Sequence, residues 1–181
     1  MNKCDICSNQ VEHRRSDIDN PYRYTECGLP NVNLLDLDVY YCPECEIEVA
    51  DIPNPEGLHR LLATEILLNP LPISGAEFRF LRKELGMKPK TFADRIGVDP
   101  KTIINWEKSA SLSKQNDILV RYIVATSLLE GERLRKAIEL LNTLIEDETW
   151  EQTEQEIAEL AETNTWLGIT GTEWMIGPDH A

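Results

Sequence analysis

The sequence lacks several features that would assign it to large classes of protein. It contains no run of eighteen apolar residues, so no membrane-spanning helix and no membrane partner are expected. Its first residues, MNKCDICSNQ, lack the apolar segment of a signal peptide, so we expect a cytoplasmic protein with reduced thiols. The three histidines, His13, His59 and His180, lie far apart, and no nucleophile has a base motif beside it. We therefore expect that the protein is not an enzyme.

Basic residues are also scarce, because 18 lysines and arginines face 32 aspartates and glutamates, for a net charge of -14. The scarcity is uneven along the chain. Residues 75–114 carry nine basic and five acidic side chains, whereas residues 1–54 carry four and eleven, and residues 115–181 carry four and fourteen. A basic segment between two acidic arms can still bind phosphates, although the arms weaken non-specific binding.

Four of the five cysteines form two C-x-x-C pairs, CDIC at residues 4–7 and CPEC at residues 42–45. Two residues between cysteines let both thiolates of a pair reach one ion, and two such pairs close a tetrahedron. We therefore predict one structural Zn²⁺ per chain, bound by Cys4, Cys7, Cys42 and Cys45. Unligated thiols and a redox dithiol are the weaker alternatives, the second because no thioredoxin-like βαβ context is present.

A rubredoxin-like iron site has similar spacing and would make the protein an electron carrier. Such sites usually place a glycine after each pair, whereas Ser8 and Glu46 stand here. Cys27 is interpreted as a small packing residue in preference to a fifth ligand. His13 is interpreted as a surface residue.

Between the cysteine pairs, residues 22–25 and 32–41 are rich in β-branched and aromatic residues, with a break at residues 28–31. This pattern predicts a small meander of strands that depends on the metal for much of its stability. Residues 51–55 are expected to form a linker. Leucines and isoleucines at helical spacing then predict a helix over residues 56–68, which ends at the proline-rich residues 69–72.

Residues 73–111 have the start and stop signals of a helix-turn-helix. Residues 74–77 have the spacing of a capping box, and the following apolar stripe is Phe78, Leu81 and Leu85, with Arg79, Arg82 and Lys83 assigned to the other face. Gly86 ends this helix. A second helix begins at Pro89, Gly97 provides the turn, and Asp99 with Pro100 begins a third helix that runs to about Lys108.

The third helix is expected to present a DNA-reading face. Ile103 and Trp106 share its buried side, which leaves Lys101, Asn105 and Lys108 on the opposite side with Ile104 at the edge. Asparagine can pair with adenine, lysine can reach guanine or a phosphate, and isoleucine can contact a thymine methyl group. The predicted DNA-contacting residues are Lys88, Lys90, Lys101, Thr102, Ile104, Asn105 and Lys108. An ordinary three-helix bundle with a solvated face is the alternative.

The segment LRKELGMKPKTFADRIGVDPKTIINWEKS resembles the helix-turn-helix of the Cro-repressor type (XRE). The resemblance places the base-reading positions at Lys101 and Asn105. It departs from the family where Lys88 replaces the usual serine or threonine cap, where Pro89 replaces a phosphate-contacting glutamine, and where Ser109 replaces a glycine. Lys90 is then expected to contact the phosphate.

The order of the zinc pairs, a linker helix and this helix-turn-helix resembles the MqsA family of antitoxins, which have a YgiT-type zinc finger at the N-terminus. The resemblance covers about residues 1–122. It implies a dimeric repressor that binds a palindromic operator in double-stranded DNA and whose zinc module binds a toxin. A stand-alone regulator without a toxin is the main alternative, because the neighbouring gene is not visible in the sequence.

The remaining chain is expected to be helical and acidic. Residues 117–129 are apolar on several faces and would complete the bundle or join a dimer interface, and Gly131 separates them from an amphipathic helix over residues 134–145. A strongly acidic helix is expected over residues 149–163, either as a solvated face or as a surface for a basic partner. Residues 165–177 would form a terminal hairpin or a loose tail.

The expected fold class is therefore α+β. A small zinc-stabilised β module (residues 1–54) is followed by a linker helix (55–73), an all-α helix-turn-helix domain (74–129) and an acidic helical extension with a tail (130–181). The predicted function is a zinc-containing, sequence-specific DNA-binding transcriptional repressor, the antitoxin of a type II toxin-antitoxin system that regulates its own operon.

Overall fold

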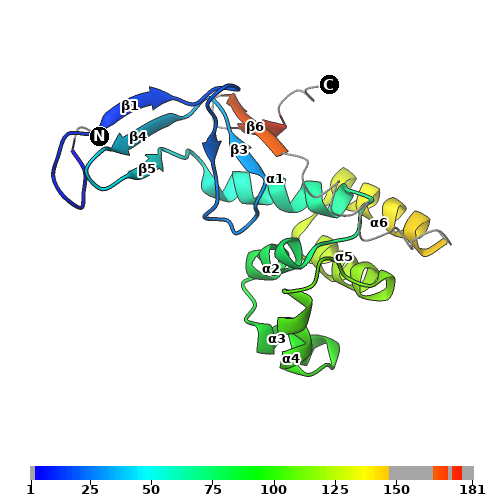
Figure 1. The fold of residues 1–181 in the computed structure, drawn as a ribbon. Coiled ribbons are helices and arrows are strands. Elements are labelled where there is room, and N and C mark those ends of the chain that lie inside the picture. The colour runs from blue at the N-terminus through cyan, green and yellow to red at the C-terminus, as the bar shows by residue number, and fades with distance from the viewer. Residues whose placement is uncertain (1–2, 147–164, 171–172, 177–181) are drawn as a thin grey trace. The chain divides into compact units, whose positions relative to one another are not determined.

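A computed structural model of the chain describes residues 3–146, 165–170 and 173–176, the last two segments as backbone (Figure 1). Among the described residues the fold is α+β, as predicted, with short strands before six helices and two more strands after them. The chain divides into two compact units. Unit 1 contains Met1–Thr25, Asn31–Leu58 and Asn164–Ala181, and unit 2 contains Glu26–Pro30 and His59–Thr163.

Unit 1 contains two sheets. The first has the order β1-β4-β5 and the second β2-β3-β6-β7. Their strands are β1(Glu12–Arg15), β2(Tyr22–Arg23), β3(Val32–Leu34), β4(Asp38–Cys42), β5(Ile47–Ala50), β6(Thr165–Thr170) and β7(Glu173–Ile176). The predicted strands correspond to β2, β3 and β4. The sequence pattern missed β1 and β5, because their residues EHRR and IEVA are mostly exposed and lack a buried alternate face.

The C-terminal hairpin is confirmed, and it pairs with a strand from the N-terminal part of the chain. β6 and β7 pair antiparallel, and β6 also runs parallel to β3, with Val32 opposite Thr165 and Leu34 opposite Leu167. Unit 1 is therefore built from both ends of the sequence. The predicted acidic helix over residues 149–163 lies outside the described residues.

Unit 2 is helical. Its elements are α1(Pro55–Leu68), whose first residues are assigned to unit 1, then α2(Gly75–Glu84), α3(Pro89–Ile96), α4(Pro100–Trp106), α5(Lys114–Leu128) and α6(Gly131–Glu146). In Figure 1, α3 lies against α4 and α5 against α6. The core includes Phe78, Phe92, Ile103, Val120 and Val124, all fully buried.

The predicted helix signals are confirmed in detail. The Ser74 side chain accepts from the backbone N–H of Glu77 at 3.3 Å, while the Glu77 carboxylate accepts from the Ser74 N–H at 2.7 Å. Gly86 and Gly97 have φ of 67° and 74°, the left-handed conformation that ends α2 and α3. The Asp99 carboxylate accepts from the Lys101 N–H at 2.8 Å and caps α4.

A buried ion pair fixes the end of α1 against α5. Arg121 is 1% exposed and donates from Nε to Asp117, and Asp117 in turn accepts from the Ile73 N–H at 2.6 Å. The remaining guanidinium nitrogens donate to four carbonyls, those of Ile66, Leu67, Asn69 and Leu71. Because the last carbonyls of a helix have no intrahelical partner, this arginine satisfies groups that burial would otherwise leave unpaired.

Candidate metal centre and nucleic-acid interface

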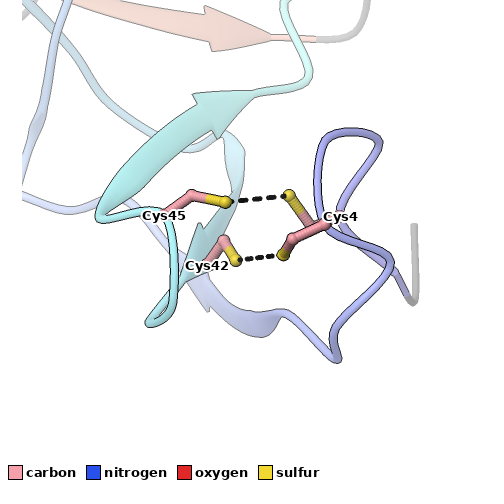
Figure 2. A group of neighbouring side chains, drawn as sticks. Cys4, Cys42 and Cys45 are labelled. Atoms are coloured by element: carbon pink, nitrogen blue, oxygen red, sulfur yellow. Dashed lines mark hydrogen bonds between the residues drawn. The ribbon is translucent and has the colours of Figure 1, made fainter.

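The four predicted cysteines converge at one end of the first sheet of unit 1. Cys4 and Cys7 lie in a loop closed by the pairing of Lys3 with Gln10, while Cys42 ends β4 and Cys45 lies in the turn before β5. Figure 2 shows Cys4 facing Cys42 and Cys45 across this space. Among the described residues these four are the group that could hold a metal ion.

The distances between the sulfurs fit a tetrahedral ion. All four Sγ atoms lie within 4.8 Å of one another, with 3.5 Å between Cys7 and Cys42 and 3.9 Å between Cys4 and Cys45. A tetrahedron with metal–sulfur bonds of about 2.3 Å has edges of about 3.8 Å. A disulfide would require about 2.05 Å, so these cysteines are free thiols. The cluster can therefore hold a metal ion with four thiolate ligands.

Each cysteine pair is followed by a residue in the left-handed conformation. Ser8 has φ of 61° and Glu46 has φ of 54°. The Ser8 N–H donates to the Cys4 carbonyl at 2.9 Å, and the Cys4 N–H donates to the Asn9 carbonyl at 2.8 Å, which closes the first loop tightly. Ser8 and Glu46 therefore adopt the left-handed backbone conformation that glycine usually supplies after such a cysteine pair. The absence of glycine here is therefore no argument against an iron site.

The thiols have unequal tendencies to ionise. Backbone N–H groups of Cys7 and Ile6 lower the pKa of Cys4 to about 7. The Cys7 side chain, burial and the other two thiols raise the pKa of Cys45 to about 12. A metal ion must therefore displace protons to gain four thiolate ligands, and its binding is expected to depend on pH.

The two other residues that the sequence offered as possible ligands are not part of the cluster. Cys27 is buried, as expected of a packing residue, and burial raises the pKa of its thiol. His13 is exposed, and its Nε2 lies 2.8 Å from a carboxylate oxygen of Asp38. Neither belongs to the four-cysteine group.

The predicted DNA-reading residues of the third helix lie on the outer face of α4, apart from Lys108, which lies in the turn after it because α4 ends at Trp106 and not at about Lys108. Lys101, Ile104, Asn105 and Lys108 are exposed, and Thr102 is half-buried. On the inner side Ile103 is fully buried, and the Trp106 ring packs edge-on against Phe78 at 5.6 Å. Lys88 and Lys90 are both exposed at the start of α3, and Lys88 occupies the N-cap position without a side-chain cap.

Arg82 corrects the sequence interpretation, which assigned it to the solvent-facing side of α2. It is 6% exposed, and its Nε donates to the Glu107 carboxylate at 2.6 Å. It also donates to the Met87 carbonyl in the turn before α3. Position 82 follows Phe78 by four residues, so helical spacing places it on the buried stripe of α2. Its positive charge alone favoured the solvent-facing side. Arg82 thus ties α2 to the residue that follows α4.

Gly75 is a second positioning residue that the sequence did not indicate. Its N–H donates to the Ser109 carbonyl at 3.2 Å, so the start of α2 contacts the end of the α4 segment. A Cβ atom at this position would lie 2.6 Å from the carbonyl oxygens of both Ser109 and Trp106. These oxygens belong to the backbone, so the contact cannot be relieved by turning a side chain.

The Gly75→Ala substitution is expected to lower the free energy of unfolding of unit 2 by about 1 to 3 kcal/mol, because two backbone segments must move apart. It should also weaken DNA binding, since the displaced segment carries α4. Urea denaturation followed by the helical circular dichroism signal would measure the first effect. A Gly75→Ala protein as stable as the wild type would contradict the close contact.

None of the helices among the described residues combines the length and apolar character needed to cross a membrane. Comparison with known proteins adds no assignment: no family model matches the chain, and no curated protein or solved structure is significantly similar to it.

Proposed function

We propose that this chain is a sequence-specific DNA-binding transcriptional repressor. The observation that carries the proposal is the outer face of α4, where Lys101 and Asn105 are exposed on a helix held by the turn at Gly97 and the cap at Asp99. Lys108 is exposed in the turn just after this helix. Residues 75–114 also form the basic segment of an otherwise acidic chain. Such a helix suits the major groove, where amide and ammonium groups read base edges.

We propose that the repressor binds a palindromic operator as a homodimer, because one recognition helix contacts few base pairs and two-fold closure is common. Leu119 and Tyr122 on α5 are 37% and 56% exposed, so they suit a subunit interface. Selection of duplexes from a random pool should enrich an inverted repeat, with two chains bound per duplex. Enrichment of no sequence would contradict the proposal.

Two substitutions should separate base reading from phosphate contact. Asn105→Ala is expected to cost about 1 to 3 kcal/mol on the selected site and to relax the preference at one base pair. Lys90→Ala should weaken binding to all sequences alike and reduce the dependence on salt. Titrations on the selected duplex and on a scrambled duplex, each at two salt concentrations, would measure both. Equal effects of the two substitutions on both duplexes would contradict these roles.

We propose that the four cysteines bind one structural Zn²⁺ per chain, which closes the shell and leaves no position for a substrate. Electron transfer by an iron site is the second candidate, and the left-handed backbone at Ser8 and Glu46 is compatible with it. Metal analysis of protein purified without added metal distinguishes them. One zinc per colourless chain is expected, and substantial iron with colour would replace the zinc assignment.

We further propose that the repressor is the antitoxin of a type II system that regulates its own operon. Its support is the resemblance of residues 1–122 to the MqsA family and the acidic character of both arms, which suits a basic RNA-cleaving toxin. A cytoplasmic location is part of this proposal, because free thiols suit a reducing compartment. Expression of the neighbouring gene alone should arrest growth, and co-expression of this chain should restore it. A harmless neighbour leaves a stand-alone repressor.

A further inference from the structure

Strand β5 is an edge strand that the fold leaves uncovered. Among the described strands it pairs only with β4, through four residue pairs from Val39 with Ala50 to Cys42 with Ile47. Its residues Ile47, Glu48 and Val49 are all exposed. An exposed edge offers a row of unpaired N–H and C=O groups to any strand that can align with it.

The other described edges that carry side chains are treated differently. β1, at the opposite edge of the same sheet, carries Glu12, Arg14 and Arg15, the kind of charged strand that discourages pairing. β2, at one edge of the second sheet, has only two residues, Tyr22 and Arg23, and a very short edge strand offers little to pair with. β5 has neither device, since it has four residues and contains no lysine, arginine or proline, and no described strand lies beyond it in its sheet.

One face of β5 is apolar. Ile47 and Val49 alternate onto the same face and are 40% and 46% exposed. Val49 lies opposite Tyr40, whose ring is 5.2 Å from that of His13, so this face continues across all three strands. Glu48 points to the other face, where Arg14 binds its carboxylate at 2.7 Å. That ion pair holds the strand in place without blocking its outer edge.

The negative charge around β5 favours a positively charged partner. Glu44, Glu46, Glu48 and Asp51 lie within eight residues, and residues 43–54 contain no basic side chain. Two copies of β5 paired edge to edge would place acids opposite acids, which is unfavourable. A cationic strand would instead gain both ladder hydrogen bonds and favourable charge.

We propose that β5 is the docking site for an edge strand of a cationic protein, which extends the β1-β4-β5 sheet while its apolar side chains cover Ile47 and Val49. This inference rests on the proposed function, because it assigns the surface that binds the toxin. The C-terminal hairpin has a distinct role, since it pairs with β3 in the second sheet and does not pair with β5.

The test uses the full chain, and its probe is the purified product of the neighbouring gene. The double substitution Ile47→Lys with Val49→Lys adds the charges that protect natural edges, and it should weaken binding about 30-fold or more. Ile18→Lys is the matched control, because Ile18 is also 40% exposed in unit 1 but lies outside every strand. It should change the affinity less than about threefold, the size of an ordinary rim contact. Metal content must equal that of the wild type in both variants.

A second measurement requires no substitution. Hydrogen exchange of the wild-type chain should slow at the amides of β5 when the probe binds, and it should stay unchanged at those of β1. The inference is overturned if the wild-type chain binds the probe and the double substitution does not weaken that binding. It is also overturned if the probe slows amide exchange only outside β5. Either result leaves the proposed function intact. A self-associated wild-type chain that the double substitution dissociates also overturns the inference, in favour of a second copy. Absence of wild-type binding removes the toxin partner and the inference together.

Discussion

Removal of the metal ion is expected to unfold the first sheet of unit 1 while unit 2 keeps its helices. The residues between the cysteine pairs bury a small core, and the loop at Cys4 is held by few backbone hydrogen bonds. In modules of this size structural zinc contributes about 10 to 16 kcal/mol of apparent binding free energy, which is also folding energy. Unit 2 has its own buried core and does not contain the four ligands.

The substitution Cys4→Ser with Cys42→Ser removes one ligand from each pair and should reproduce the effect of a chelator. Cys27→Ser is the matched control, because Cys27 is a cysteine outside the cluster and should leave the metal content at one per chain. Hydrogen exchange would report the loss of protection in β4 and β5, and circular dichroism would report the retained helices. Full protection of β4 in the metal-free protein would contradict a structural role.

Acid is expected to have the same effect as chelation. Thiols bind the ion as thiolates, and the pKa of Cys45 is about 12 without it, so protons compete with the metal throughout the neutral range. As the pH falls below about 7 the thiol of Cys4 also becomes protonated, and the competition increases. Metal occupancy, and the stability that depends on it, should therefore fall as the pH is lowered.

The Arg121→Met substitution is expected to lower the free energy of unfolding of unit 2 by about 3 to 5 kcal/mol. Arg121 and Asp117 are 1% and 0% exposed, so the substitution leaves the Asp117 carboxylate buried without its cation. It also deprives four backbone carbonyls at the end of α1 and after it of their donor. Both losses act in the same direction.

Arg135→Met provides the control for this prediction. Arg135 makes ion pairs with Glu132 and Glu139, but its side chain is 58% exposed, so its loss should change stability far less than the loss of Arg121. Urea denaturation of the metal-loaded proteins, followed by the helical signal, would compare the two variants. Similar midpoints for both would show that the buried pair does not hold α1 in place.

Local signals made much of this fold predictable from the sequence. The capping box at Ser74, the glycines at 86 and 97 and the cap at Asp99 each act within a few residues, so the helix boundaries followed from short-range chemistry. The metal cluster was predictable for a similar reason, since C-x-x-C spacing fixes the geometry of each half. Two halves 34 residues apart then had one chemically sensible arrangement.

The features that escaped prediction depend on distant partners. Arg82 pairs with Glu107, 25 positions away, and Arg121, besides its ion pair with Asp117 one turn earlier, donates to carbonyls 50 to 55 positions away. A buried arginine is stable only when it is paired in this way. The pairing of β6 with β3 joins residues more than a hundred positions apart, and no local pattern specifies such a register. β5 does alternate polar and apolar residues, but it is only four residues long, so the alternation is brief.

A footprint on the DNA upstream of the gene for this chain tests the central claim most directly. The wild-type chain should protect an inverted repeat whose half-sites lie about one helical turn apart, as for other dimeric helix-turn-helix proteins. The Lys101→Ala with Asn105→Ala protein should leave the same DNA unprotected at equal concentration. Protection by both proteins alike, or by neither, would contradict a repressor that reads DNA through α4.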